Sequence, residues 1–112
     1  MLIISSIKDV TVARFDNISK INVLISEALK ANFKKILETP NVKLLVNMEG
    51  VDFIDSSGFT AFLTALRTAQ KNNGQILICN VSDAALELFK VLHLHTVLKI
   101  VDNQTEALSL FE

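Results

Sequence analysis

Two short hydrophobic runs at the start of the chain predict a β-hairpin. Residues 2–7 and 10–15 are rich in β-branched side chains, and only the polar pair Lys8 and Asp9 separates them. β-Branched residues favour strands, and two strands joined by a tight polar turn are typical of a hairpin. We therefore expect an antiparallel pair of strands here.

A helical pattern of hydrophobic residues follows the hairpin. Residues 16–19 offer side chains that can cap a helix, and Pro40 requires the helix to end near Glu38 or Thr39. Between these limits apolar residues recur at spacings of three and four, so we predict a helix over about residues 20–37. Its predicted inward face consists of Ile21, Leu24, Ile25, Ala28, Leu29, Phe33, Ile36 and Leu37.

Apolar runs without helical polarity predict further strands beyond Pro40. Residues 42–48 are mostly apolar, as expected for a central strand covered on both faces. Shorter apolar runs over 75–80 and 96–101 predict two more strands, and residues 51–54 form a hydrophobic strand region before a polar turn. The sheet should therefore contain about five strands.

Helical patterns alternate with these strands. Residues 57–71 repeat apolar side chains at spacings of three and four, and Gly74 is suited to the left-handed backbone that often follows a helix. Ser82 is a cap for a third helix, and Asn103 with Glu106 three residues later indicates the start of a fourth. The predicted inward residues of the second and third helices are Phe59, Phe62, Leu63, Leu66, Ala69, Ala85, Leu86, Phe89 and Leu92.

The alternation of strands and helices predicts the fold class. Successive strand–helix–strand units imply right-handed crossovers and parallel strands. We predict an α/β fold, with a mixed sheet of about five strands that includes the amino-terminal hairpin, and with about four α-helices. Its length of 112 residues suits one core, so residues 1–112 are expected to form a single domain.

Composition narrows the functional classes. Half of the residues are hydrophobic and the formal net charge is −1, which argues against disorder and against direct binding of nucleic acid through bulk charge. The single cysteine, Cys79, lies in an apolar run and is expected to be buried; no disulfide within the chain is possible, which favours a reducing cytoplasm. Neither a signal peptide nor a spanning segment is recognisable, so any membrane role is expected to come through a partner.

The polar turn after residue 54 is the candidate functional site. Asp55 and Ser56 can each cap a helix, Ser57 adds a second hydroxyl, and Gly58 would let the backbone or a partner approach closely. A helix amino terminus has unpaired N–H donors and a partial positive charge, so a phosphate on either serine would be tolerated there. An ordinary helix cap explains the same residues, and the motif alone favours that interpretation.

The other candidate sites are less specific for any one chemical function. His93 and His95 could ligate a metal, but no cysteine or acidic cluster lies near them in sequence, so we expect no metal and no cofactor. Asp52 and Asp55 could suggest acid–base catalysis, although two carboxylates leave substrate and geometry undefined. Phosphate-binding glycine loops and the nucleophile elbow of hydrolases are absent, so we do not predict an enzyme.

The segment around the polar turn resembles the signature of the STAS domain, which is named for sulfate transporters and anti-sigma factor antagonists. Its sequence is Val51-Asp52-Phe53-Ile54-Asp55-Ser56-Ser57-Gly58-Phe59. The likeness covers nearly the whole chain, including 85–92 and 106–108 near its end. In the bacterial antagonists the serine directly after the aspartate is the phosphoacceptor, and that position is Ser56. The resemblance implies a STAS-like fold and a partner-binding surface at Asp55, Ser56, Ser57, Gly58 and Phe59.

The resemblance also implies a switchable binding module that regulates transcription. Unphosphorylated, such an antagonist binds an anti-sigma factor that is a serine kinase; phosphorylation of Ser56 would end the interaction, and a serine phosphatase would restore it. We expect a monomer, with no direct nucleic-acid or membrane contact. Two alternatives remain: a STAS subunit that is never phosphorylated and binds a transporter ATPase or another scaffold, and a small enzyme with Ser56 as nucleophile, for which no general base is identifiable.

Overall fold

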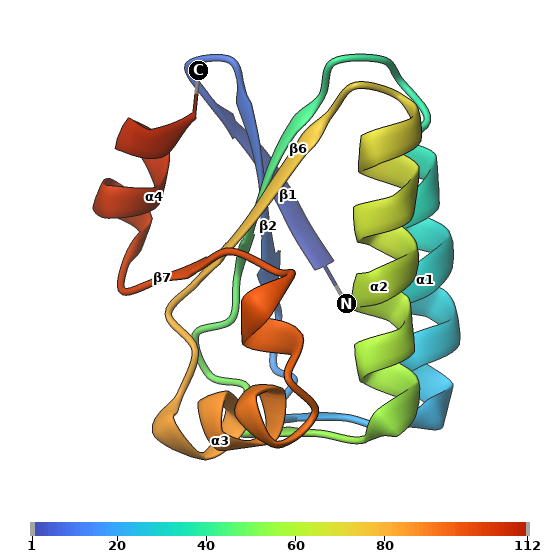
Figure 1. Cartoon of the computed structure of the whole chain (residues 1–112), viewed down its shortest axis with the longest axis vertical. Coiled ribbons are helices and arrows are strands. Elements are labelled where there is room, and N and C mark those ends of the chain that lie inside the picture. Colours follow the sequence, from blue (N-terminus) through green and yellow to red (C-terminus); the bar gives the residue numbers. More distant parts are fainter. Residues whose placement is uncertain (1, 112) are drawn as a thin grey trace.

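The computed structural model describes residues 2–111, which form seven strands, four α-helices and one 3₁₀ turn (Figure 1). Within these residues no helix is long and apolar enough to cross a membrane. The strands are β1 (Leu2–Ile7), β2 (Val10–Phe15), β3 (Lys20–Ile21), β4 (Lys43–Asn47), β5 (Phe53–Ile54), β6 (Gln75–Cys79) and β7 (Ile100–Val101). The helices are α1 (Val23–Leu37), α2 (Ser56–Lys71), α3 (Asp83–Val91) and α4 (Gln104–Leu110), and the 3₁₀ turn is Leu94–Thr96.

A five-stranded mixed sheet forms the centre, in the order β1-β2-β4-β6-β7. Strand β1 pairs antiparallel with β2, from Ile7 opposite Val10 to Leu2 opposite Phe15, and the other neighbours are parallel. The predicted α/β class, hairpin and mixed sheet are therefore confirmed. The last strand is shorter than predicted, because residues 94–96 form a 3₁₀ turn and only residues 100–101 pair with β6.

A small second sheet corrects the predicted start of the first helix. Lys20 and Ile21 form β3, which pairs in parallel with β5, and Asn22 caps α1 so that the helix begins at Val23. The prediction of a helix from residue 20 is wrong for these residues. A two-residue strand has too few positions to show its own periodicity, and its partner lies far along the chain.

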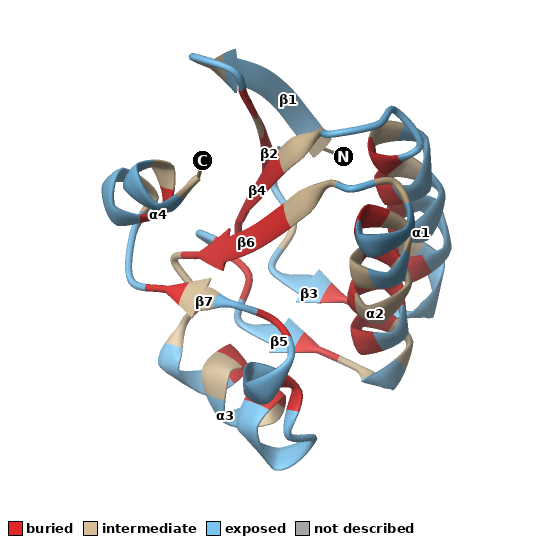
Figure 2. Cartoon of the chain, turned by 45° about the horizontal axis from the view of Figure 1, so that its top comes forward, coloured by how far each residue is buried: buried red, intermediate tan, exposed pale blue. Residues whose placement is uncertain are grey.

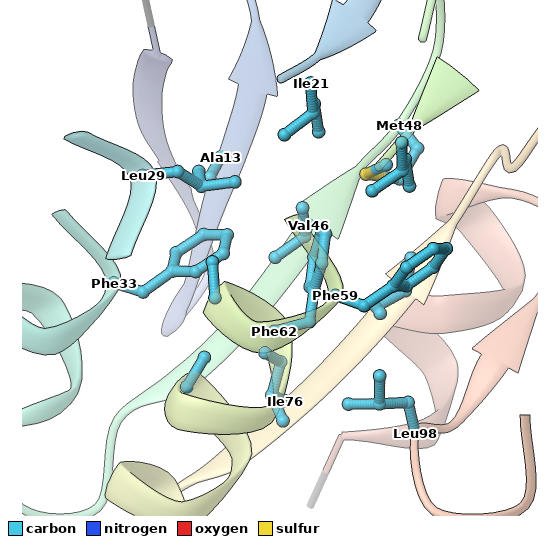
Figure 3. Close-up of a cluster of buried hydrophobic side chains, with 14 of the residues drawn as sticks. Ala13, Ile21, Leu29, Phe33, Val46, Met48, Phe59, Phe62, Ile76 and Leu98 are labelled. Carbon is cyan, nitrogen blue, oxygen red and sulfur yellow. The ribbon is translucent and has the colours of Figure 1, made fainter. Parts of the chain in front are cut away.

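Helices α1 and α2 pack side by side against one face of the sheet (Figures 1 and 2). The larger core lies between them and the sheet, and Figure 3 shows Phe33 and Phe62 there, with ring centroids 5.4 Å apart. Within residues 2–111 the other face carries the short helix α4 alone, above a smaller cluster of Val10, Val12, Leu45, Leu77, Cys79, Val101 and Ala107. The two faces are therefore covered unequally.

Several predicted inward positions differ from the structure. Leu24 is 80% exposed, Ala28 is exposed, and Leu92 is 48% exposed, because each lies at the edge of its helix's apolar face or outside it. In α2 the most deeply buried large side chain is Phe62, whereas Leu63 and Leu66 are half-buried beside the core.

The backbone after α2 also differs from the prediction. Asn73, with φ of 58°, takes the left-handed conformation expected for Gly74. A Cβ at Gly74 would lie 2.9 Å from the carbonyl oxygen of Val42, so that glycine serves close backbone packing instead.

Candidate functional site

The pairing of β3 with β5 brings two helix caps together. Ile21 lies opposite Ile54, and the residues that follow, Asn22 and Asp55, are the N-caps of α1 and α2. The Asp55 N–H donates to the carbonyl oxygen of Ile21 over 3.0 Å, which fixes the two chains at the same level. The amino termini of α1 and α2 therefore lie side by side, and their partial positive charges act on the same surface.

Asp55 caps α2 with its carboxylate. Its Oδ1 accepts hydrogen bonds from the N–H groups of Ser57 and Gly58, over 3.0 and 3.2 Å, and from the Ser57 hydroxyl. The Ser57 hydroxyl is the main cause of a lowered pKa of Asp55, and the two backbone donors add to it against an opposing effect of desolvation. Asp55 is thus an ionised cap at neutral pH, as the sequence predicted for its capping role.

Ser57 joins the two helices through a second hydroxyl. Its Oγ lies 2.9 Å from the Oγ of Ser26, which donates to the carbonyl oxygen of Asn22 over 2.7 Å. A hydroxyl carries one proton, so Ser57 donates to either Asp55 or Ser26 at a given moment. The hydroxyl of Ser57 is therefore part of an internal polar chain that connects the first turns of α1 and α2.

Ser26 is the member of this site that the sequence interpretation missed. It is only 3% exposed, and its hydrogen bonds satisfy the buried hydroxyl. The sequence did contain an indication that Ser26 is buried. It precedes Leu29 by three residues and Phe33 by seven, which places it on the apolar face of α1. A polar residue at an inward helical position indicates a buried partner.

Ser56 differs from Ser57 in its exposure. It is the first residue of α2, it is exposed, and no hydrogen bond to its hydroxyl occurs among residues 2–111; only its carbonyl oxygen is used, by the Thr60 hydroxyl over 3.1 Å. Asp55, not Ser56, caps the helix. Of the two serines, Ser56 is the one whose hydroxyl is accessible from solvent.

Gly58 and Phe59 lie inside the protein. A Cβ at Gly58 would lie 2.5 Å from Cγ2 of Ile54 and 2.9 Å from Cγ2 of Ile21, so the glycine allows α2 to approach β3 and β5 closely. Phe59 is 4% exposed, and its ring lies 4.9 Å from that of Phe89, centroid to centroid. Phe59 is therefore part of the core, as its helical spacing predicted, and the close approach at Gly58 is made by the protein's own strands. A contact of these two residues with a partner stays a prediction.

Exposed apolar side chains lie close in sequence to the two paired caps. Val23 and Leu24, in the first turn of α1, are 58% and 80% exposed, and Phe53, at the end of β5, is 43% exposed. These three residues flank the paired caps in sequence, so they belong to the same end of the molecule (Figure 2). We refer to Val23, Leu24 and Phe53 as the apolar rim.

The remaining candidates show no comparable arrangement. The rings of His93 and His95 stack with centroids 6.4 Å apart, and no cluster of three potential metal ligands exists within residues 2–111. Cys79 is buried as predicted; desolvation, with a smaller effect of the Glu49 charge, raises its pKa to about 11. A thiol of that kind is protonated and inert at neutral pH.

Comparisons with known proteins identify relatives of this fold. A STAS domain protein from Planctomyces limnophilus, described as an anti-sigma-factor antagonist, superimposes with a TM-score of 0.89 at 22% identity, over 96% of this chain and 95% of its own. The anti-sigma factor antagonist SpoIIAA superimposes in its unphosphorylated form with a TM-score of 0.78 at 19% identity, over 97% and 94% of the two chains. Its phosphorylated form, from Bacillus, gives a TM-score of 0.70 at 19% identity, over 97% of each chain.

A transporter-related protein shares the same fold. The structure of a sulfate transporter family protein from Wolinella succinogenes superimposes with a TM-score of 0.77 at 20% identity, over 94% of this chain and 86% of its own. At such identities the superpositions establish the fold. The family is established by sequence, because the STAS domain family model matches residues 3–107. The chain therefore belongs to the STAS domain family.

Proposed function

We propose that this protein is an anti-sigma factor antagonist whose partner binding is switched by phosphorylation of Ser56. In its unphosphorylated form it binds an anti-sigma factor serine kinase and so frees a sigma factor for transcription. The kinase phosphorylates Ser56 and thereby ends the interaction, and a serine phosphatase reverses the modification. The protein acts as a single domain in the cytoplasm, as a monomeric binding module without enzymatic activity of its own.

The observation that carries this proposal is the contrast between the two serines. The Ser57 hydroxyl is bonded to Asp55 and lies close to Ser26, whereas the Ser56 hydroxyl is exposed without a hydrogen bond in the described chain. A kinase must reach the hydroxyl that it modifies without dismantling the helix start. Ser56 meets that requirement, and it is also the serine directly after the aspartate of the family motif.

The paired helix amino termini support a phosphate at this position. A phosphoserine adds about −1.5 to −2 charge, which the positive ends of α1 and α2 partly compensate. The fold can therefore tolerate the modification. A complex with a partner tolerates the phosphate less well than the free protein does. The phosphate would lose its hydration in a close interface, and it would repel acidic groups of the partner.

The apolar rim supports partner binding at the same end. Exposed large hydrophobic side chains contribute to association when a partner removes them from water. Leu24 and Phe53 each lie two residues from one of the paired caps, Asn22 and Asp55, so a partner that covers the rim is expected to cover the Ser56 hydroxyl as well. The proposed contact surface consists of Asp55, Ser56 and Ser57 with the apolar rim, while Gly58 and Phe59 support it from beneath.

The likeness to a sulfate transporter family protein favours a second candidate function. In that case the chain binds a transporter ATPase or another scaffold through the same surface and is never phosphorylated. The two candidates differ in whether a charge at Ser56 controls affinity.

The test combines intact mass with affinity. The parent protein, Ser56→Ala and Ser57→Ala are incubated with the cognate kinase and ATP; we expect one phosphate on the parent and on Ser57→Ala and none on Ser56→Ala. Kinase affinity is then measured for Ser56→Ala and Ser56→Asp by calorimetry. We expect the alanine variant to bind and the aspartate variant to bind at least about tenfold more weakly, a difference of about 1.4 kcal/mol.

Equal affinities of Ser56→Ala and Ser56→Asp, with no phosphate on the parent protein, would exclude the switch and leave the scaffold function. Thermal melts of both variants provide the control for folding. Because Ser56 is exposed and Asp55 supplies the cap, each variant should unfold within about 0.5 kcal/mol of the parent.

A further inference from the structure

A cavity of about 470 Å³ lies between the β1–β2 turn and helix α4. Its apolar walls include Ile7, Val10, Leu108 and Phe111, and Lys43 contributes a charged group. In Figure 1 the β1–β2 turn and α4 lie away from the start of α2, where Ser56 is located. The cavity is therefore separate from the proposed switch, and its volume falls in the range of about 300–1,000 Å³ typical of small-molecule sites.

The cavity follows from the unequal cover of the sheet. Two helices of 15 and 16 residues cover one face, whereas in the described part of the chain α4, with seven residues, is the only helix over the smaller core cluster on the other. The cavity lies where the first residues of β2 and β4, Val10 and Lys43, face Leu108 and Ser109 of α4. Val10, which is 3% exposed, lies in the cavity wall and belongs to that core cluster, so a ligand there would extend the apolar packing.

Lys43 gives the cavity its chemical preference. Its side chain is only 20% exposed, and its Nζ donates to Oδ2 of Asp9 over 3.1 Å. An ammonium group has three donors, and Asp9 is its one hydrogen-bond partner within residues 2–111. Asp9, on the hairpin turn, is 76% exposed, so its carboxylate is a counterion that another carboxylate can replace at little cost.

We propose that this cavity binds a small amphipathic carboxylate. The apolar body of the ligand would lie against Val10, Leu108 and Phe111, and its carboxylate would accept hydrogen bonds from Lys43. Lys8 also lines the cavity, so the lining holds two positive charges, Lys8 and Lys43, against one negative charge, Asp9, and favours a single anionic head over a cationic or neutral one. The cavity thus combines an apolar wall with an ammonium group whose hydrogen bond to Asp9 is exposed, an arrangement complementary to a carboxylate that carries an apolar body.

The experiment titrates the protein with octanoate and follows backbone amide resonances. Two matched probes serve as controls. Acetate has the carboxylate without the long alkyl chain, and octylammonium has the alkyl chain with a positive charge in place of the carboxylate. We expect octanoate to shift the amides of Val10, Lys43, Leu108 and Phe111, with little change near Ser56. We expect neither acetate nor octylammonium to saturate these shifts.

Two variants test the role of the ion pair in opposite directions. Lys43→Met retains length and removes charge, so octanoate should bind about tenfold more weakly, as expected for the loss of a charge-assisted hydrogen bond. Asp9→Ala removes the competing carboxylate from an exposed position, so the same probe should bind more tightly. Lys30→Met, which removes an exposed lysine of α1, is the control and should leave octanoate affinity unchanged.

The proposal would be overturned by the absence of a saturable shift at the cavity with octanoate, by equal binding of octylammonium, or by no gain in affinity in Asp9→Ala. If Lys43→Met does not fold, the octanoate affinity of Asp9→Ala still tests the proposal, because Asp9 lies on an exposed turn where the substitution should not prevent folding. Binding of octanoate that Lys43→Met and Lys30→Met weaken equally would also count against it.

Discussion

Replacement of Gly58 by alanine should destabilise the protein through a clash inside it. The new Cβ would lie 2.5 Å from Cγ2 of Ile54 and 2.9 Å from Cγ2 of Ile21, distances at which one of the groups must move. Both isoleucines are at most 1% exposed and branched at Cβ, so neither methyl can turn away freely. The helix must shift away from the β3–β5 pair, or the isoleucines must leave their preferred rotamers.

The expected magnitude is the difference of two opposing effects. Overpacking a well-packed core costs about 1–3 kcal/mol, and alanine gains up to about 1 kcal/mol over glycine within a helix. Gly58 lies in the first turn, where the gain is smaller, so we expect a net loss of about 1–2 kcal/mol. In a domain of this size, a loss of that kind lowers the melting temperature by about 4 °C or more.

Urea unfolding of the purified variants is the assay. Thr60→Ala, at an exposed position in the same helix, is the control and should stay within about 0.5 kcal/mol of the parent. A double-mutant cycle with Ile54→Leu tests the cause, because leucine lacks the methyl on Cβ that the new side chain would meet. We expect Gly58→Ala to cost at least about 0.5 kcal/mol less in that background.

The reasoning is refuted if Gly58→Ala unfolds at the same urea concentration as the parent or at a higher one. An unchanged cost in the Ile54→Leu background would show that the loss has another origin. A variant that stayed fully stable but lost partner binding would restore the idea that Gly58 faces a partner.

Three further predictions follow from burial and charge. Phe62→Ala should cost about 3–5 kcal/mol in a denaturant melt, and Leu63→Ala only about 1–2, because Phe62 is fully buried and Leu63 half-buried; a larger cost for Leu63 would contradict the packing. The pKa of Asp55 is lowered from its ordinary value of 3.8, so the stability that its ionised form contributes is present above that value and lost as the pH falls below it. Asp55→Asn should therefore show a smaller fall in melting temperature than the parent between about pH 6 and about pH 3, and equal falls would argue against the carboxylate cap. Cys79, with its pKa raised to about 11, should react with a thiol-specific disulfide reagent at about pH 8 only as fast as the protein opens, whereas rapid labelling of the native protein would show an accessible thiolate.

The sequence predicted those parts of the fold that have their own periodicity. The hairpin turn at Lys8 and Asp9, the strand around Leu45 and the helix caps at Ser82 and Asn103 are local signals, and the structure has each of them. Asp55 was predicted as a cap for the same reason, since a cap depends on residues within three positions of it.

The parts that could not be predicted depend on contacts between distant segments. Strand β3 exists because Ile21 pairs with Ile54, which no local pattern records. The same pairing determines that Gly58 faces the protein's own isoleucines, although the glycine itself was recognised as a site of close approach. Ser56 and Ser57 are adjacent and chemically identical in the sequence, and only the position of Ser26 on the neighbouring helix distinguishes them.

The unequal cover of the sheet also sets where the native protein opens first. Helix α4 has seven residues, too few for a stable isolated helix, and of its side chains only Ala107 is fully buried. Its detachment therefore requires much less free energy than global unfolding, and its amide hydrogens should exchange with solvent long before those of β4 and β6. Each such opening exposes Leu45 and Leu77 on one face of the sheet, while α1 and α2 keep the paired caps on the other side in place.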